Sequence, residues 1–372
     1  MTAAIPLSAP DVTEDEIAVV VAVLRTRQLS LGPELAAFES ELAAYHGVEH
    51  AVAVSSGTAG LHLALQTLGI GAGDEVVVPS FTFVAVANTV LQVGATPVFA
   101  EIDPRTLNLD AAAVERAITP RTRALVVVHT FGVPARMDAL LEVARRHDLR
   151  VIEDACEAIG AHFDGRRAGS FGDLAVLGFY PNKQMTTGEG GAVLGREAAY
   201  AARLRRLRNQ GRDADADWLD HAEPGYNYRL SELACALGRA QLRRIDSMLA
   251  LRREAAGRYD ALLAAIPGLE RPPRALPRSE TSWFVYVVRL PEGVDRDGVR
   301  AALARQGIAT GRYFAPIHQQ PAWRGRGPAP HLPLTESIAR RTLALPFFNR
   351  ITSEEQQYVT EALRAALASA AR

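Results

Sequence analysis

The sequence contains almost no lysine and almost no cysteine. Lys183 is the only lysine among the 41 Lys and Arg side chains of this 372-residue chain. Cys156 and Cys235 are the only cysteines, too few for a disulfide framework or a zinc cage. The formal net charge of -1 gives no electrostatic reason to expect a nucleic acid or an anionic membrane as partner.

Long apolar runs are missing as well. No stretch approaches the roughly 20 consecutive apolar residues of a membrane span. Met1 is not followed by a basic and then apolar signal segment. At roughly 150 residues per domain, the length fits two domains or one large domain with an appendage. We therefore expect a cytoplasmic globular protein, and an enzyme.

The single lysine is the first candidate functional residue. A bias in codon usage alone could explain why Arg fills the other basic positions. Lys183 is nevertheless the only residue of this chain whose side chain can form a Schiff base, because the guanidinium of Arg stays protonated. The residues around Lys183 are therefore expected to carry the function.

Short β-branched and apolar runs alternate with helical patterns along the first half of the chain. This pattern is typical of an α/β fold with a mainly parallel sheet covered by helices, in which ligands bind beyond the carboxyl ends of the strands. The predicted strands are Ala51–Val54, Glu75–Val78, Pro97–Ala100, Ala124–Val128 and Arg150–Glu153.

The second half of the chain predicts a smaller α+β unit. A helical pattern runs from Ser231 towards Ile266, and Ser282–Leu290 reads as a strand. We expect residues 1–246 to form a large domain and residues 247–372 a smaller one, to which the N-terminal residues also contribute.

Small residues follow the first predicted strand. Ser55 to Gly60 open a helical pattern, and the free amides and dipole of a helix N-terminus suit a phosphate. The same residues also suit an ordinary Ser or Thr N-cap, so both interpretations stay open.

Acidic residues end the last of these strands. Glu153 and Asp154 are adjacent, so their side chains point to opposite faces and cannot form a catalytic pair. Asp154 stands at the strand end, where a buried carboxylate could keep a pyridine nitrogen protonated or simply cap a turn.

Glycines follow the lysine closely. Gly188, Gly190 and Gly191 allow tight backbone turns beside a ligand. The segment is not a P-loop, because no glycine directly precedes Lys183 and no helical pattern follows it. A phosphate cradle, a carboxylate at a strand end and a Schiff-base lysine together match pyridoxal 5′-phosphate (PLP).

At this point the sequence resembles the sugar aminotransferases of the DegT/DnrJ type, within the fold-type I PLP enzymes. The resemblance covers nearly the whole chain. It rests on six segments in this order: Ser56–Ala59, Val78–Phe83, Glu153–Ala155, Lys183 with Thr186–Gly191, Gly225–Ser231 and Tyr313–His318.

The resemblance implies a role for each matching residue. Lys183 would form the Schiff base with PLP and then move the proton between substrate and cofactor. Asn227 would reach the phosphate from the neighbouring subunit, which implies a homodimer with shared active sites. No metal is implied. The remaining roles are phosphate binding by Gly57, Thr58 and Ala59, pairing with the pyridine nitrogen by Asp154, stacking on the ring by Phe83, and substrate binding by Tyr313, His318 and Arg229.

Alternatives to these roles remain open from the residues alone. Phe83 could be a core residue, Asn227 a turn residue and His318 a structural histidine. Arg229, together with Arg212 and Arg312, could face a diphosphate, but most arginines of this chain must be ordinary surface charges.

Two positions depart from the pattern of the family. Gly178 stands five residues before the lysine, where many members carry a serine that helps to bind phosphate. Glu157 stands three residues after the aspartate, where Gln or His is common near the phenolic oxygen of PLP. Because an ionised carboxylate would repel a phenolate, Glu157 either carries a proton in the site or turns away.

The resemblance implies an aminotransferase that works by ping-pong half-reactions. The expected donor is an amino acid, L-glutamate, and the expected acceptor is a nucleotide-linked keto sugar, with a cyclic polyol ketone as the alternative. Relatives that dehydrate deoxysugars carry His in place of Lys183. A PLP-binding regulator without turnover is a further alternative, although the chain keeps the lysine. The nucleotide, the sugar and the carbon that is aminated do not follow from the sequence.

Overall fold

The computed structural model describes residues 4–213, 220–274, 276–326 and 330–370. A seven-stranded sheet with the order β1-β9-β8-β5-β4-β2-β3 forms its centre. The strands from β8 to β3 are parallel, and β9 is antiparallel to both of its neighbours, β1 and β8. The mainly parallel α/β fold predicted from the sequence is therefore confirmed.

All five predicted strands are present to within two residues at each end. Two further strands of the sheet, β8 and β9, flank the Lys183 segment and were not predicted. The strands of the central sheet are β1 His50–Val54, β2 Glu75–Pro79, β3 Thr96–Ala100, β4 Thr122–Val128, β5 Arg150–Asp154, β8 Leu174–Gly178 and β9 Gly191–Gly195.

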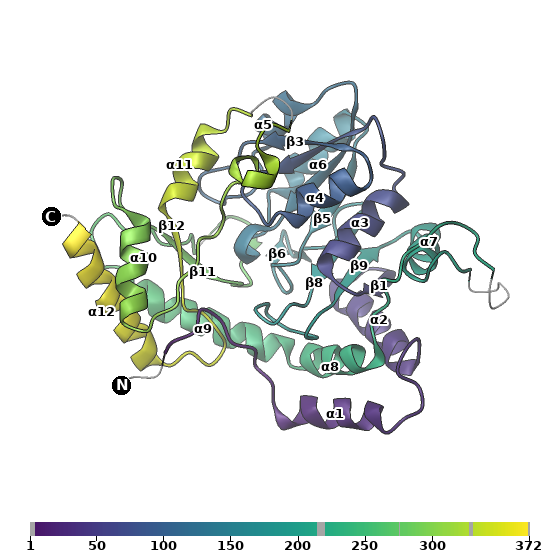
Figure 1. The fold of residues 1–372 in the computed structure, drawn as a ribbon, viewed down its shortest axis with the longest axis horizontal. Helices are drawn as coiled ribbons and strands as arrows, with labels where there is room; N and C mark the ends of the chain where they lie inside the picture. Colours follow the sequence, from purple (N-terminus) through teal and green to yellow (C-terminus); the bar gives the residue numbers. More distant parts are fainter. Residues whose placement is uncertain (1–3, 214–219, 275, 327–329, 371–372) are drawn as a thin grey trace.

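Helices cover both faces of the sheet (Figure 1). Side chains alternate along a strand, so Val76 and Val78 of β2 pack under α3, α4 and α7, whereas Val77 packs on the opposite face with α5 and α6. Helices α2 and α8 cover the part of that second face formed by β1, β8 and β9. The covering helices are α2 Pro33–His46, α3 Gly57–Thr67, α4 Ala85–Gln92, α5 Ala111–Ala117, α6 Met137–Arg146, α7 Ala198–Arg208 and α8 Glu232–Arg243.

A second hydrophobic core lies in the C-terminal part of the chain. It packs around a two-stranded antiparallel sheet, and Ile5 joins it through backbone bonds to Gly307 and Ala309. Ile5 thus packs in the C-terminal core, while the boundary at residue 247 and the part of the N-terminal residues in the smaller domain stay predictions. The elements are α9 Ile245–Leu263, β11 Tyr286–Arg289, α10 Arg296–Arg305, α11 Pro333–Arg341, β12 Thr342–Leu345 and α12 Ser353–Ala370.

The long helical pattern from Ser231 is two helices in the structure. Ser231 caps α8, and the chain turns at Arg244, where φ is -102° and ψ is 0°. Helix α9 then runs across the lower part of the molecule in Figure 1, from α8 to α12. Its first turns belong to the core of the large unit and its last turns to the C-terminal core.

The remaining elements are short or lie at the edge. Helix α1 packs along α8, away from the sheet (Figure 1). The predicted strand Ser282–Leu290 is regular only over β11, because Trp283 has a φ of +57° and interrupts the extended backbone. These elements are α1 Glu14–Leu24, β6 His162–Phe163, β7 Arg166–Arg167, β10 Ser279–Glu280, and the 3-10 turns η1 Thr130–Gly132, η2 Ile317–Gln319 and η3 Pro321–Trp323.

Candidate active site

The carboxyl ends of β1, β5 and β8 meet at one edge of the sheet. Gly57, the first residue of α3, packs directly against Cys156, which follows β5, and against Gly178, the last residue of β8. A Cβ atom on Gly57 would lie 2.8 Å from Cys156 Sγ and 3.5 Å from Gly178 Cα. The N-terminus of α3 therefore sits over the end of β5, which carries Asp154, and over the end of β8, which leads to Lys183.

The N-terminus of α3 has both features that its sequence suggested: a serine N-cap and backbone amides that could bind an anion. Ser56 is an N-cap, and its Oγ accepts the Ala59 N–H at 3.0 Å. Among the residues that the structure describes, the amides of Gly57 and Thr58 have no acceptor. The first turn of the helix thus offers two free amides and the positive end of the helix dipole to an anion.

The two acidic residues of β5 face opposite sides, as predicted. Glu153 is fully buried and accepts backbone N–H groups of Gly169, Phe171 and Gly172 at 2.6–2.8 Å. Burial alone would raise the pKa of Glu153, but these donors and His129 hold it below its ordinary value. Glu153 is therefore a structural anion, and the role of Asp154 as the carboxylate of the site stays a prediction.

His129 shows how this structural anion is fixed. Its Nδ1 accepts the Ala135 N–H at 3.0 Å, so Nδ1 carries no proton. Its Nε2 lies 2.9 Å from Glu153 Oε2 and is then the donor of that hydrogen bond. A neutral histidine and a charged carboxylate thus hold the end of β5 in place.

Lys183 lies in a confined place beside a carboxylate and an aromatic ring. Its side chain is 14% exposed, and its Nζ is 3.5 Å from Glu157 Oε1. The same nitrogen is 4.0 Å from the centroid of the Phe284 ring. A positive charge on Nζ is therefore stabilised from two sides.

Glu157 does not turn away from the site. Its Oε2 accepts the Phe131 N–H at 2.9 Å, which aims the other oxygen at Lys183. Burial raises the pKa of Glu157, Asp154 adds to this effect, and the charge of Lys183 opposes it. The structure places Glu157 beside the lysine in an environment that favours a protonated carboxyl group when no cation is near.

Of the two predicted aromatic residues, the structure brings Tyr313 close to the lysine segment. The Tyr313 hydroxyl accepts the Asn182 amide at 3.4 Å, which places it next to the residue that precedes Lys183. Burial raises the pKa of Tyr313, and the nearby charge of Glu157 raises it further. Phe83 is 62% exposed and is therefore not a core residue. Its stacking on the cofactor stays a prediction.

His318 is engaged within the chain through both ring nitrogens. Nδ1 lies 2.7 Å from Ser80 Oγ, and Nε2 lies 3.1 Å from Glu336 Oε1. This environment suits the structural alternative, and a contact with substrate stays a prediction.

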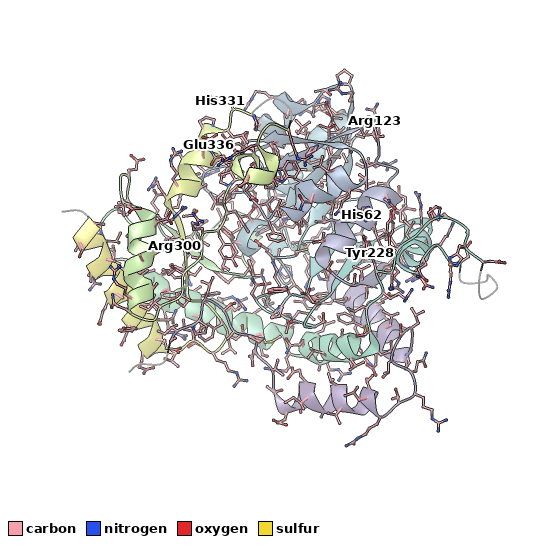
Figure 2. All side chains as sticks on the ribbon, viewed as in Figure 1. His62, Arg123, Tyr228, Arg300, His331 and Glu336 are labelled. Carbon is pink, nitrogen blue, oxygen red and sulfur yellow. The ribbon has the colours of Figure 1, made fainter. Side chains whose placement is uncertain are left out.

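Asn227 and Arg229 have no described contact with Lys183. Their segment runs beside α3, where the Tyr228 hydroxyl lies 3.3 Å from His62 Nδ1 (Figure 2). Asn227 is exposed, and Arg229 donates to Asn209 Oδ1 at 2.9 Å. Their roles at the cofactor and the substrate stay predictions.

The sequence did not single out Phe284 or Arg252. Phe284 lies in the interrupted strand, where no local pattern marks it. Arg252 had a signal: it occupies the apolar stripe of α9, between Met248 and Ala255, which are both fully buried. An arginine on such a stripe is an exception that the sequence alone could have shown.

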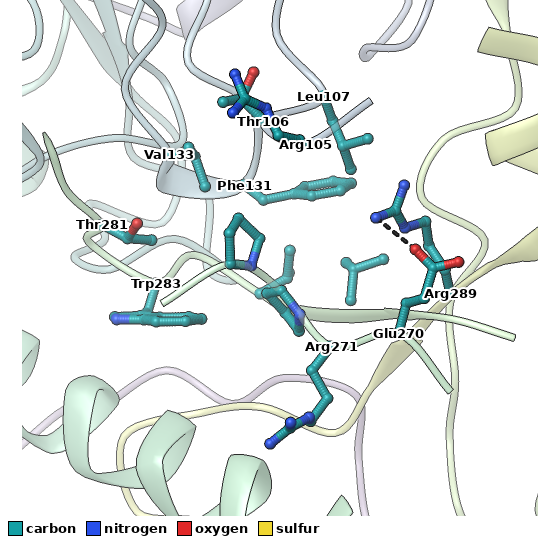
Figure 3. A pocket seen from close by; sticks show the side chains of 14 residues that line it. Arg105, Thr106, Leu107, Phe131, Val133, Glu270, Arg271, Thr281, Trp283 and Arg289 are labelled. Atoms are coloured by element: carbon teal, nitrogen blue, oxygen red, sulfur yellow. Dashed lines mark ion pairs between the residues drawn. The ribbon is translucent and has the colours of Figure 1, made fainter. Parts of the chain in front are cut away.

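A cavity beside Phe131 is not the site itself, because neither Asp154, Glu157 nor Lys183 lines it. Figure 3 shows Phe131 and Trp283 in its wall and the ion pair between Glu270 and Arg289, 2.7 Å apart, at one side. Its volume is about 30 Å³. That is too small for any sugar, so the cavity is a packing gap between the two units.

The described residues contain neither a candidate membrane-spanning helix nor a candidate metal site. None of the helices in this part of the chain is both long enough and apolar enough to cross a bilayer. Within the same residues, no three His, Cys, Asp or Glu side chains are grouped so that they could hold a metal ion.

The fold and its edge-of-sheet site place the chain among the fold-type I PLP-dependent transferases. The model of the DegT/DnrJ/EryC1/StrS aminotransferase family matches residues 10–364. The chain belongs to this family, as the sequence resemblance predicted.

Similar proteins agree with this assignment. GDP-perosamine synthase of Caulobacter vibrioides is 41% identical over 363 residues, 96% of this chain and 97% of that protein. The dTDP-3-amino-3,4,6-trideoxy-alpha-D-glucose transaminase of Streptomyces venezuelae is 43% identical over 350 residues, 93% of this chain and 90% of that protein. The crystal structure of S. venezuelae DesV in complex with a ketimine intermediate has a TM-score of 0.91 and 40% identity, and covers 98% of both chains.

Proposed function

We propose that this protein uses PLP to transfer the amino group of an amino acid, L-glutamate, to the ketone of a nucleotide-linked sugar. The observation that carries this proposal is the meeting of three groups at one edge of the sheet. The only lysine of the chain, the Asp154 carboxylate and the free amides of α3 come from segments far apart in sequence.

The residues of the site fit PLP group by group. The amides of Gly57 and Thr58 suit its phosphate, whereas the Ala59 amide is already bonded to Ser56. Asp154 suits the pyridine nitrogen, and Lys183 is the only side-chain amine available for the aldehyde. When bound, PLP supplies an electrophilic carbonyl carbon and a ring that withdraws electrons from the amino acid.

Lys183 is the group that moves the proton. Its Nζ takes the α-proton of the donor and returns it at the cofactor carbon. During that step Lys183 must be a free amine and not part of a Schiff base. Once Nζ carries the proton, Phe284 and Glu157 stabilise the resulting charge at 4.0 and 3.5 Å. Because burial raises the pKa of Glu157, its carboxyl group holds a proton best while Nζ is neutral.

The names of the relatives support the class of acceptor. One relative is named for a GDP-linked sugar and another for a dTDP-linked sugar. A cyclic polyol ketone remains the alternative acceptor, and the nucleotide of this chain is not fixed. The cytoplasmic location expected from the sequence stays a prediction.

The exposed side chain of Asn227 supports a homodimer with shared active sites. Backbone contacts with Ser55 and Asn209 hold its segment in place. The Asn227 side chain is therefore presented to solvent, where it could enter a neighbouring subunit. We propose that Asn227 completes the phosphate site of the partner.

The first test is a visible absorption scan of the protein with PLP, before and after L-glutamate is added. We expect a violet absorption band, which gives the protein a yellow colour, to disappear when glutamate is added. We also expect amino transfer when nucleotide-linked keto sugars are then supplied. Lys183→Ala should lower turnover by at least about 1,000-fold, because the base is lost. Lys183→Arg is the matched variant that keeps the charge without a condensable amine.

Each outcome of the scan discriminates between the functions. A band that ignores glutamate would retain PLP and reject this donor. A band with no amino transfer to any acceptor would favour the regulator. Comparable turnover by Lys183→Ala would refute the role of the lysine.

A further inference from the structure

Arg252 is a buried cation next to the backbone of the proposed catalytic lysine. It lies in the middle of α9 and is 2% exposed. Among the described residues, no carboxylate forms an ion pair with it. Burial lowers its pKa to about 10, so it remains charged at neutral pH.

Three backbone carbonyls take the place of a carboxylate. Nη1 donates to Trp283 O at 3.1 Å and to Phe284 O at 3.0 Å. Nη2 donates to Lys183 O at 3.3 Å. A buried charge is costly unless hydrogen bonds satisfy it, and the planar fork of a guanidinium reaches several acceptors at fixed angles.

These carbonyls belong to two segments that must meet for the site to form. One segment carries Lys183, and the other carries Phe284, whose ring lies 4.0 Å from Lys183 Nζ. A second bridge joins the same segments, because Gln184 Nε2 donates to Ser282 Oγ at 2.9 Å. Arg252 therefore fixes the lysine and the ring beneath it relative to each other.

The backbone conformation of Trp283 allows two successive carbonyls to reach Arg252. Its φ of +57° lies in the left-handed region that bulky residues rarely adopt. This conformation interrupts the extended chain just before β11, and the Trp283 and Phe284 carbonyls both reach the same guanidinium nitrogen. Loss of the donor would leave both carbonyls unsatisfied and loosen the segment that carries Phe284, which backbone bonds to Phe131 and Gly132 hold from the other side.

We propose that Arg252 is a positioning residue for Lys183. Its guanidinium holds the backbone of Lys183 and the ring of Phe284 in the geometry that presents the amine, a role that rests on the proposed function of Lys183. The neighbouring Arg253 is the contrast, because it is exposed and pairs with Glu280 at 2.7 Å.

The single lysine allows a test without cofactor. Reductive methylation of the apoprotein with formaldehyde, followed by peptide mass spectrometry, reports the reactivity of Lys183 without interference from other lysines. We expect Arg252→Met to raise the rate of Lys183 methylation at least about threefold, because the held segment opens more often. Arg253→Met is the matched control and should leave the rate unchanged.

A second measurement uses the protein with PLP. The visible circular dichroism per bound PLP reports the orientation of the cofactor, and we expect Arg252→Met to reduce it to about half or less. The rate of the glutamate half-reaction should fall by about tenfold to 100-fold, with a smaller change in KM, because misplacement of the amine affects the chemical step most. Arg252→Lys keeps the charge but not the planar fork and should recover part of each effect.

The outcomes separate a positioning role from a merely structural one. If Arg252→Met is less stable but methylates at the wild-type rate and keeps the visible circular dichroism, the proposal is wrong. If Arg252→Met does not fold, the same two measurements are made on Arg252→Lys. A wild-type methylation rate together with wild-type visible circular dichroism in that variant would overturn the proposal. A wild-type protein that shows no visible band with PLP would instead refute the proposed function, and the methylation rates would still be readable.

Discussion

Cys156 explains two glycines of the candidate phosphate site. Its sulfur occupies the space that a side chain would need on either glycine: an added Cβ would lie 2.8 Å from Sγ at Gly57 and 3.1 Å at Gly178. Burial raises the pKa of the Cys156 thiol, so it acts as a neutral packing group and not as a nucleophile. The glycine at 178, where many family members carry a serine, is therefore matched to the cysteine at 156.

This match predicts that the two positions are coupled. Gly178→Ser alone should lower the free energy of unfolding by about 1–3 kcal/mol, because the new side chain overpacks against Cys156. Gly178→Ser with Cys156→Ala should recover most of that loss and bind PLP at least as tightly as the wild type. Urea unfolding and a PLP titration of the four proteins of this double-mutant cycle would measure the coupling.

Cys235→Ala is the control for a cysteine that does not touch either glycine. A coupling energy below about 0.3 kcal/mol between positions 156 and 178 would show that the two sites are independent.

Among the structural elements, a hydrogen-bonded chain joins the end of β2 to α11. Ser80 follows β2, His318 lies in η2, and Glu336 belongs to α11, which is labelled in Figure 1. The Ile317 N–H also donates to Ser80 O at 3.0 Å. Because Phe83 lies three residues after Ser80, this chain fixes the loop that is expected to cover the cofactor.

The contacts predict a structural effect for His318→Ala. It should lower the free energy of unfolding by about 1–3 kcal/mol, because Ser80 and Glu336 lose their partner in a partly buried place. The value of kcat/KM for the acceptor should change less than about tenfold if no substrate contact is lost. Thermal unfolding and steady-state kinetics of the same preparation would measure both.

The opposite result would restore the role implied by the family resemblance. A loss of kcat/KM well beyond tenfold with unchanged stability would show that His318 touches the substrate. Glu336→Gln is the comparison, because it removes the charge but keeps an acceptor for the histidine.

At the scale of the molecule, the site lies between two cores that α9 connects. The large core holds the sheet edge with Asp154 and Lys183, and the C-terminal unit supplies Phe284 and Tyr313. The exposed Phe83 and Asn227 are left without cover in a single chain. This arrangement supports a site that a second copy of the chain completes.

Mixed dimers provide a direct prediction of this assembly. Lys183→Ala and Asn227→Ala homodimers should each have low activity. Equal mixing and reassociation should restore about a quarter of the wild-type activity, because half of the dimers then contain one intact site of two. The measurement is turnover before and after the subunits exchange.

A mixture in which no dimer can contain an intact site serves as the control. Lys183→Ala mixed with the Lys183→Ala/Asn227→Ala double variant contains no intact site and should gain nothing. No recovery in the first mixture either would mean that Asn227 serves its own subunit, whereas an active Asn227→Ala homodimer would mean that it serves no site.

The sequence by itself determined five strands of the sheet and singled out Lys183 as the candidate reacting residue. Runs of buried β-branched residues mark strands such as β4 and β5 because a parallel sheet covered on both faces needs apolar side chains throughout. The end of β5 then placed Asp154 at the ligand edge. The scarcity of lysine pointed to Lys183, and the order of the motifs identified the family.

Only the tertiary structure decided how the site is held. The orientation of Glu157 depends on the amide of Phe131, and the places of Phe284 and Arg252 depend on contacts with residues about 70 to 100 positions away. Arg244, where the two helices meet, likewise pairs with Asp11 and Glu16, more than 200 positions earlier in the chain. Local periodicity records which side chains are buried but not which distant carbonyl or carboxylate they meet, and those meetings fix the geometry of this site.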